Sequence, residues 1–163
     1  MSAPSARIEG YSPGALGRVV ELHARWYAKH WNFGLHFEAL VARGLAEFLG
    51  AFDAARDGFW TARLGGDIAG SVSLVGARGG EPARLRWFIL DEAAQGRGLG
   101  RALMQSAMDF CRASGCRHAY LTTFAGLDAA RALYERHGFT LTHQAEDRTW
   151  GVPVTEQRYD WRA

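Results

Sequence analysis

Lysine and cysteine are almost absent from this sequence of 163 residues. Of its 19 basic residues, Lys29 is the only lysine and the rest are arginines. The two cysteines, Cys111 and Cys116, are too few for a disulfide framework, and no spacing with histidine is typical of a metal site. We therefore expect free thiols, as in a protein of the reducing cytoplasm, and no bound metal.

Long apolar runs and a strong net charge are also missing. No run approaches the roughly 20 apolar residues that span a bilayer. The first ten residues, MSAPSARIEG, lack the basic and apolar segments of a secretory signal. A formal net charge of +2 gives no electrostatic case for nucleic acid as a partner. We therefore expect a cytoplasmic protein that binds neither nucleic acid nor a membrane.

The composition that is present is typical of a packed globular protein. Hydrophobic residues make up 48% of the chain and aromatic residues 12%, too much apolar surface for a disordered chain. A length of 163 residues suits one core. The sequence predicts a single domain over residues 1–163, with residues 1–6 as a loose tail.

Hydrophobic periodicity predicts a mixed α/β fold, because the apolar spacing switches several times between helix and strand patterns. A helix is expected to start at Ser12 and Pro13, since a hydroxyl can cap a helix whose first residue is proline. The expected elements, in chain order, are a short strand in 6–11, helices in 13–31 and 35–52, two strands in 58–76, a strand in 83–91, a helix from 99 to about 115, a strand in 117–124, a helix in 127–137 closed by Gly138, and strands in 139–146 and 154–161.

The stretch QGRGLG at residues 95–100 lies between a predicted strand and a predicted helix. A P-loop would need lysine and then serine or threonine after its last glycine, where this chain has Arg101 and Ala102. A dinucleotide fingerprint would need glycine at position 101. The form that fits is Q-x-x-G-x-G, in which backbone N–H groups converge at a helix N-terminus and bind a pyrophosphate. The side chains of Arg97 and Arg101 add positive charge there.

This stretch resembles the acyl-CoA-binding motif of the GCN5-related N-acetyltransferase (GNAT) superfamily. FILDEAA at 88–94 resembles the central strand of that family and its bulge, and ALYERHGF at 132–139 resembles its late helix. The N-terminal part is similar to GNAT domains fused to winged-helix regulators, without the DNA-binding half. The resemblance implies a mixed, mostly antiparallel, twisted sheet of six to seven strands flanked by four helices.

The resemblance also implies a reaction. Acetyl-CoA would serve as the cosubstrate, and its acetyl group would pass to a primary amine of a small molecule or peptide by direct attack in a ternary complex. The backbone amide of Leu90 would hold the acyl carbonyl, and Tyr134 would protonate the leaving thiolate. The residues alone favour a core role for Tyr134, and the family match reverses that preference. The expected cofactor-binding residues are Phe88, Ile89, Leu90 and Asp91 along the pantetheine arm, and Gln95, Gly96, Arg97, Gly98, Leu99, Gly100 and Arg101 at the pyrophosphate.

Two features of the site are left open by the sequence. Many members of the family carry asparagine seven residues before the tyrosine, where this chain has Leu127, and neither Leu127 nor Asp128 is assigned a cofactor role. The general base is not identified either: Asp91, Glu92, His143, Glu156 and a chain of waters are the alternatives. The remaining histidines, which include His23, His30 and His36, are interpreted as ordinary packing or surface residues.

The acceptor is not identified by the sequence. An aromatic-rich segment at 26–37 is either the wall of an acceptor pocket or simple helix packing. Arg84 and Arg86 share one face of a predicted strand, where they bind an acceptor carboxylate, bind cofactor phosphates or face solvent. A non-catalytic acyl-CoA sensor is the alternative function, and a Tyr134 turned away from the sulfur would favour it. A transferase of longer acyl chains and a homodimer through the last strands also remain open.

Overall fold

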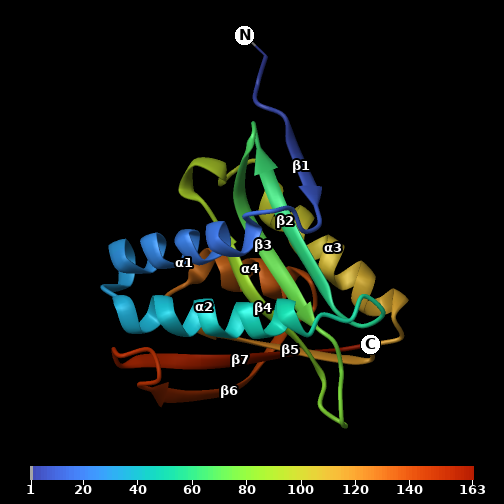
Figure 1. The fold of residues 1–163 in the computed structure, drawn as a ribbon. Helices are drawn as coiled ribbons and strands as arrows, with labels where there is room; N and C mark the ends of the chain where they lie inside the picture. The colour runs from blue at the N-terminus through green and yellow to red at the C-terminus, as the bar shows by residue number, and fades with distance from the viewer. Residues whose placement is uncertain (1) are drawn as a thin grey trace.

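The computed structural model describes residues 2–163, which form one seven-stranded sheet with helices on both faces (Figure 1). The elements are β1 (Ala6–Glu9), α1 (Ala15–Trp31), α2 (Leu35–Gly50), β2 (Gly58–Leu64), β3 (Asp67–Val75), β4 (Ala83–Leu90), the 3₁₀ helix η1 (Glu92–Ala94), α3 (Leu99–Ala113), β5 (His118–Phe124), α4 (Asp128–Arg136), β6 (Thr140–Asp147) and β7 (Val154–Arg162). This order of helices and strands confirms the one predicted from periodicity.

The strand order in the sheet is β1-β2-β3-β4-β5-β7-β6. Every neighbouring pair is antiparallel except β4 and β5, which run parallel. The strand–helix–strand crossover through α3 joins this parallel pair. The mostly antiparallel sheet with four flanking α-helices is therefore confirmed.

Each face of the sheet carries its own hydrophobic core. Helices α1 and α2 lie side by side on one face, and α3 and α4 cover the other (Figure 1). Val19, Phe37 and Leu45 are buried on the α1–α2 face, whereas Leu103 and Met108 are buried on the α3 face. The buried residues of a helix recur every three or four positions, as Leu103, Ala107 and Cys111 do in α3, so the helix presents one apolar stripe to the sheet.

The predicted start of the first helix is wrong by two residues. Helix α1 begins at Ala15, and Gly14 precedes it in the left-handed conformation with φ 91°. The Ser12 hydroxyl does not cap the helix, because it accepts a hydrogen bond of 2.8 Å from Nη2 of Arg63. The cap is instead made by the backbone, since the Ala15 N–H donates to the Ser12 carbonyl at 3.0 Å.

The two ends of the sheet differ from the simplest expectation. Among the described residues the N-terminal tail ends at Ser5, because Ala6 already pairs with Leu64 in the sheet. At the other edge, β6 exposes nearly all its side chains. The homodimer expected through the last strands stays a prediction.

No helix within residues 2–163 combines the length and apolar character that crossing a membrane requires.

Candidate active site

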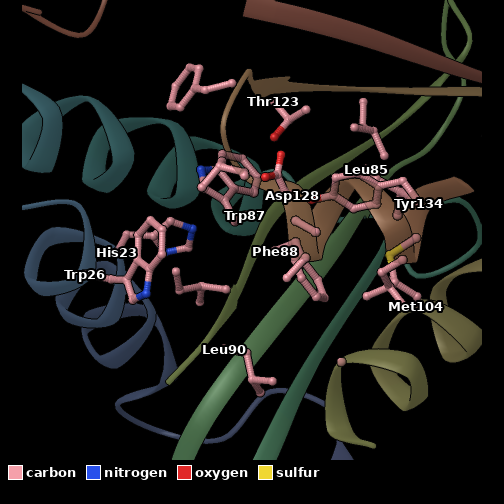
Figure 2. A pocket seen from close by; sticks show the side chains of 18 of the residues that line it. His23, Trp26, Leu85, Trp87, Phe88, Leu90, Met104, Thr123, Asp128 and Tyr134 are labelled. Atoms are coloured by element: carbon pink, nitrogen blue, oxygen red, sulfur yellow. The ribbon is translucent and has the colours of Figure 1, made fainter. Parts of the chain in front are cut away.

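A cleft opens where the two parallel strands separate. Strands β4 and β5 pair only at their starts, through Ala83 with Ala119 and Arg84 with Tyr120. Beyond these two pairs the strands diverge, and residues of both line a cleft of about 1150 Å³. Helices α1, α2, α3 and α4 supply most of its other walls (Figure 2). The central strand of the sheet therefore has a free edge along the cleft.

A β-bulge lies in the middle of β4. Ser71 of β3 pairs with Ile89, but Ser73 pairs with Arg86, so two residues of β4 stand opposite one residue of β3. Trp87 lies in the bulge with φ 52°, and its carbonyl accepts a hydrogen bond of 2.9 Å from the Ser71 hydroxyl. The bulge brings Arg86 and Trp87 onto the same face, where the guanidinium carbon lies 4.1 Å from the centre of the indole ring.

The carboxyl end of β4 directs backbone groups into this gap. The Asp91 N–H donates to the carbonyl of Ala69 in β3 at 2.7 Å. Neighbouring residues of a strand direct their N–H groups to opposite edges, so the Leu90 N–H faces away from β3 and toward the cleft. A ligand that lies along this edge can therefore pair with β4 as an added strand would.

The glycine turn after β4 forms a second set of donors. Gly96 and Gly98 both lie in the left-handed region, with φ 74° and 77°, and a Cβ built on either would meet no atom within 4 Å. Gly98 precedes α3, where no side chain caps the helix, and the first helical hydrogen bond joins the Ala102 N–H to the Gly98 carbonyl. The first-turn N–H groups without a helical partner belong to Leu99, Gly100 and Arg101. This open, uncapped turn fits a pyrophosphate.

Most of the expected cofactor-binding residues are brought together here. All of them line the cleft except Asp91 and Arg97. The Asp91 carboxylate instead accepts a hydrogen bond of 3.2 Å from the Ala93 N–H, and Arg97 Nε donates to the Ala93 carbonyl at 3.4 Å. Both side chains therefore form hydrogen bonds within the turn, and their expected contacts with the cofactor stay a prediction.

Tyr134 lies on α4 and lines the cleft from the side opposite His23 and Trp26 (Figure 2). Its side chain is only 6% exposed, and its ring lies 6.0 Å from that of Phe88. Burial raises the pKa of the phenol, so the hydroxyl is protonated at neutral pH. The Tyr134 ring therefore packs against the hydrophobic core and borders the cleft at the same time.

The carboxylates considered for the general base do not reach the cleft. Glu92 binds Lys29 Nζ at 2.9 Å and His30 Nε2, and these hydrogen bonds lower its pKa. Asp128, the first residue of α4, is the one carboxylate that lines the cleft within residues 2–163 (Figure 2). The described residues that were candidates but do not line the cleft are Asp91, Glu92, His143 and Glu156.

The aromatic segment is partly wall and partly core. Trp26, Tyr27 and Trp31 line the cleft, whereas Phe33 is 3% exposed and packs between the helices and the sheet. Trp150, from the loop between β6 and β7, joins this wall and was missed. The sequence contains one indication of this role: Trp150 is a large aromatic residue beside a glycine in an otherwise polar segment.

His23 was interpreted as an ordinary packing residue, but it lines the cleft from α1. Its Nδ1 lies 2.8 Å from the Val19 carbonyl, which requires the proton on Nδ1 and leaves Nε2 as an acceptor. Burial lowers the pKa of His23 to about 4. The ring is therefore neutral at pH 7, and the helical pattern that placed it could not distinguish a cleft from a core.

The lowered pKa of His23 predicts that the protein loses stability in mild acid. The pKa of the folded state lies below the ordinary value of 6.5, so the unfolded chain binds the extra proton between pH 6.5 and 4. The free energy of unfolding should therefore fall as the pH falls through this window, by about 2 kcal/mol between pH 7 and 4.5. Denaturant unfolding of the wild type and of His23→Leu at both pH values tests this: the variant should lack that part of the loss, and equal losses would contradict it.

The family model described as "Acetyltransferase (GNAT) family" matches residues 17–139. Mycothiol acetyltransferase of Beutenbergia cavernae is 45% identical over 64 residues, which are 39% of this chain and 21% of that protein. N-acetyltransferase 8 of Rattus norvegicus is 32% identical over 104 residues, which are 60% of this chain and 47% of that protein. The chain thus spans less than half the length of these two curated relatives.

Solved structures show the same fold. An acetyltransferase from Streptococcus agalactiae superposes with a TM-score of 0.75 at 21% identity, over 97% of this chain and 98% of that one. The yncA protein of Salmonella typhimurium, solved with its cofactor acetyl-CoA, gives a TM-score of 0.71 at 18% identity, over 96% and 93% of the two chains. Since the family model covers well over half of the sequence and the fold agrees, this chain belongs to the GNAT acetyltransferase family, whose members use acetyl-CoA.

Proposed function

We propose that this chain is a single-domain acetyl-CoA-dependent N-acetyltransferase that acetylates a primary amine of a small molecule or peptide. The observation that carries the proposal is the cleft itself. It combines the free edge of β4, the uncapped glycine turn before α3 and the hydroxyl-bearing Tyr134 in one space. We also propose a cytoplasmic location, with which the free thiols of Cys111 and Cys116 agree.

The glycine turn and the β4 edge would hold the cosubstrate. The N–H groups of the turn that ends at Gly98, with those of the first turn of α3, would bind the pyrophosphate. The edge of β4 around Phe88 and Leu90 would pair with the pantetheine arm. Open space above Gly98 admits the phosphates because no Cβ is there.

Leu90, Tyr134 and Asp128 would take part in the transfer reaction. Acetyl-CoA supplies a thioester: the amine nitrogen bonds to the acetyl carbon, and the carbon–sulfur bond breaks. The Leu90 N–H would stabilise negative charge on the acyl oxygen. Tyr134 would donate its proton to the departing thiolate, and the nitrogen would lose a proton to solvent as the amide forms, from which Tyr134 regains one. Asp128 would attract the acceptor ammonium, which loses a proton to water before attack.

The non-catalytic sensor is disfavoured by the position of Tyr134. A sensor needs no acid for a leaving thiolate, and a Tyr134 turned away from the sulfur would favour it. The ring instead lines the cleft beside Phe88. This supports catalysis, because the protonated phenol and the free strand edge belong to the same space.

Amine-dependent thiol release tests the proposal. The purified chain, acetyl-CoA and a panel of primary amines should release free CoA thiol and yield an equal amount of N-acetylated amine by mass spectrometry. Calorimetry with acetyl-CoA alone measures binding separately. If acetyl-CoA binds but no amine accelerates thiol release, the result supports the sensor hypothesis. If acetyl-CoA does not bind, both the transferase and the sensor hypotheses are wrong. Longer acyl-CoAs in the same assay measure the acyl-chain preference.

A further inference from the structure

Two arginines on β4 line the cleft without an acidic partner. Arg84 and Arg86 are both half-buried and both contribute to the cleft wall. Within residues 2–163, neither guanidinium lies within 4.0 Å of a carboxylate oxygen. Fully buried cations are almost always paired, and these two half-buried guanidiniums lie side by side with no anion beside them among the described residues.

The hydrogen bonds of the two guanidiniums are equally incomplete. Arg84 donates from Nη2 to the Thr122 hydroxyl at 3.0 Å, while its Nε is buried with no acceptor. Arg86 donates to no described residue of the chain. Each guanidinium has five N–H donors, so most of the ten remain available. Trp150 Nε1, on the aromatic wall of the same cleft, is a further buried donor without an acceptor.

Aromatic rings and helix α2 fix both groups in place. The Arg86 guanidinium stacks over Trp87 at 4.1 Å, and a Cβ at Gly44 of α2 would lie 3.7 Å from its Nη2. The Arg84 guanidinium lies 5.4 Å from the Tyr120 ring. Burial, followed by repulsion from Arg84, lowers the pKa of Arg86 to about 10. Bound negative charge would relieve both effects.

The anion is not the pyrophosphate of the cosubstrate. Arg86 and Arg84 precede Leu90 by four and six residues, which at about 3.3 Å per residue places their backbones roughly 13 and 20 Å from the end of β4. The glycine turn follows that end. The arginines also lie on the α1–α2 face, with the aromatic wall, whereas the turn leads into α3 on the opposite face. They therefore border the acceptor side of the cleft.

The nearby carboxylates do not neutralise this pair. Glu156 of β7 is close enough for Arg84 to favour its charged form, but burial and Asp147 outweigh that effect and raise its pKa. Asp128 is exposed at the start of α4 and forms no ion pair with either arginine. It remains available to the positive end of an acceptor.

We propose that the acceptor is a primary amine that also carries a carboxylate, such as an apolar amino acid, and that Arg84 and Arg86 bind this carboxylate. The inference rests on the proposed acetyl transfer and names the substrate class of that site. The fork of a guanidinium matches a carboxylate in two hydrogen bonds, and the aromatic wall with Trp26 and Trp31 suits an apolar body. The ammonium end then lies toward Asp128 and the reacting edge of β4.

Matched amines test the carboxylate directly. Phenylalanine, phenylalaninamide and phenethylamine present one aromatic body with a carboxylate, an amide or neither. Thiol release should give a kcat/KM for the acid about 10- to 100-fold above the other two, as charge-assisted hydrogen bonds imply. The amide has the less basic amine, so amine basicity would act against this preference. Equal rates for all three would overturn the inference while leaving acetyl transfer intact.

Substitutions of Arg84 and Arg86 test whether these residues cause the preference for the acid over the amide. Arg86→Met and Arg84→Met keep an apolar stem but lose the charge, and each should reduce the acid-to-amide ratio toward one, mainly through the KM for the acid. Arg86→Lys should retain part of the ratio, because it keeps charge without the fork. Arg112→Met is the matched control: Arg112 also lies over a tryptophan, Trp161, at 5.5 Å, but outside the cleft. An unchanged ratio in the Arg86 and Arg84 variants would contradict the assignment.

A second measurement needs no turnover. 3-Phenylpropanoate has the carboxylate and the aromatic body but no amine, so it should raise the unfolding temperature of the wild type and of Arg112→Met but not of Arg86→Met. The unliganded unfolding temperatures show whether each variant is folded. If acetyl-CoA binding and thiol release both fail, the proposed function is wrong; if only the carboxylate effects fail, this inference alone is wrong.

Discussion

Replacing Tyr134 with phenylalanine should lower kcat for acetyl transfer by about 10²- to 10⁴-fold, the range that general acid catalysis contributes. The substitution removes only the hydroxyl, so the ring keeps its packing against Phe88 and Tyr159. The affinity for acetyl-CoA should remain nearly unchanged. Thiol release with a saturating amine measures kcat, and calorimetry measures affinity.

Tyr159→Phe is the matched control for this loss. Tyr159 is also fully buried, its ring lies 6.3 Å from that of Tyr134, and its hydroxyl is 3.5 Å from Oε1 of Gln157. It does not line the cleft, so its loss should leave kcat close to that of the wild type. A Tyr134→Phe variant that is as active as Tyr159→Phe would mean that water protonates the leaving thiolate.

Gly98→Val should weaken acetyl-CoA binding by about 100-fold or more. A Cβ built at Gly98 would meet no protein atom within 4 Å, and the new side chain would occupy the place proposed for the phosphates. Two lost hydrogen bonds to a charged group correspond to several kcal/mol. Calorimetric titration with acetyl-CoA measures the loss, and thermal unfolding measures the strain of a positive φ, about 1–2 kcal/mol.

Gly115→Val separates the two effects. Gly115 has φ 79° against 77° for Gly98, and a Cβ there also meets nothing within 4 Å. It follows α3 outside the cleft, so the variant should show the same strain with normal acetyl-CoA affinity. Similar affinities for the two variants would place the phosphates elsewhere than at the glycine turn.

The elements and the glycine turn were predictable because their signals are local. A period change near residue 58, a glycine-rich junction and a C-terminal Gly138 with φ 89° each depend on a few neighbouring residues. The start of α1 was missed because the Ser12 hydroxyl binds Arg63, which lies 51 residues away. A cap is a local pattern only when no distant partner competes for it.

Other parts of the site depend on strand pairing. The family resemblance implied a bulge near FILDEAA, but the residues of ARLRWFILD alone read as one continuous strand; the bulge lies at Trp87, where β3 has one residue fewer than β4. His23 and Asp128 have no motif, and they became site candidates only when the divergence of β4 and β5 opened space beside them. The carboxylates first considered for the base are engaged in ion pairs or face other surfaces.

The short pairing between β4 and β5 would make the stability of the fold depend on the cosubstrate proposed to bind between these strands. Two residue pairs join the halves of the sheet, and a ligand that fills the gap as an extra strand binds only the folded chain. At a concentration of 100 times its dissociation constant, such a ligand stabilises the fold by about 2.7 kcal/mol. Proteases act on the unfolded fraction, so the chain with this ligand bound would be degraded more slowly than the free chain.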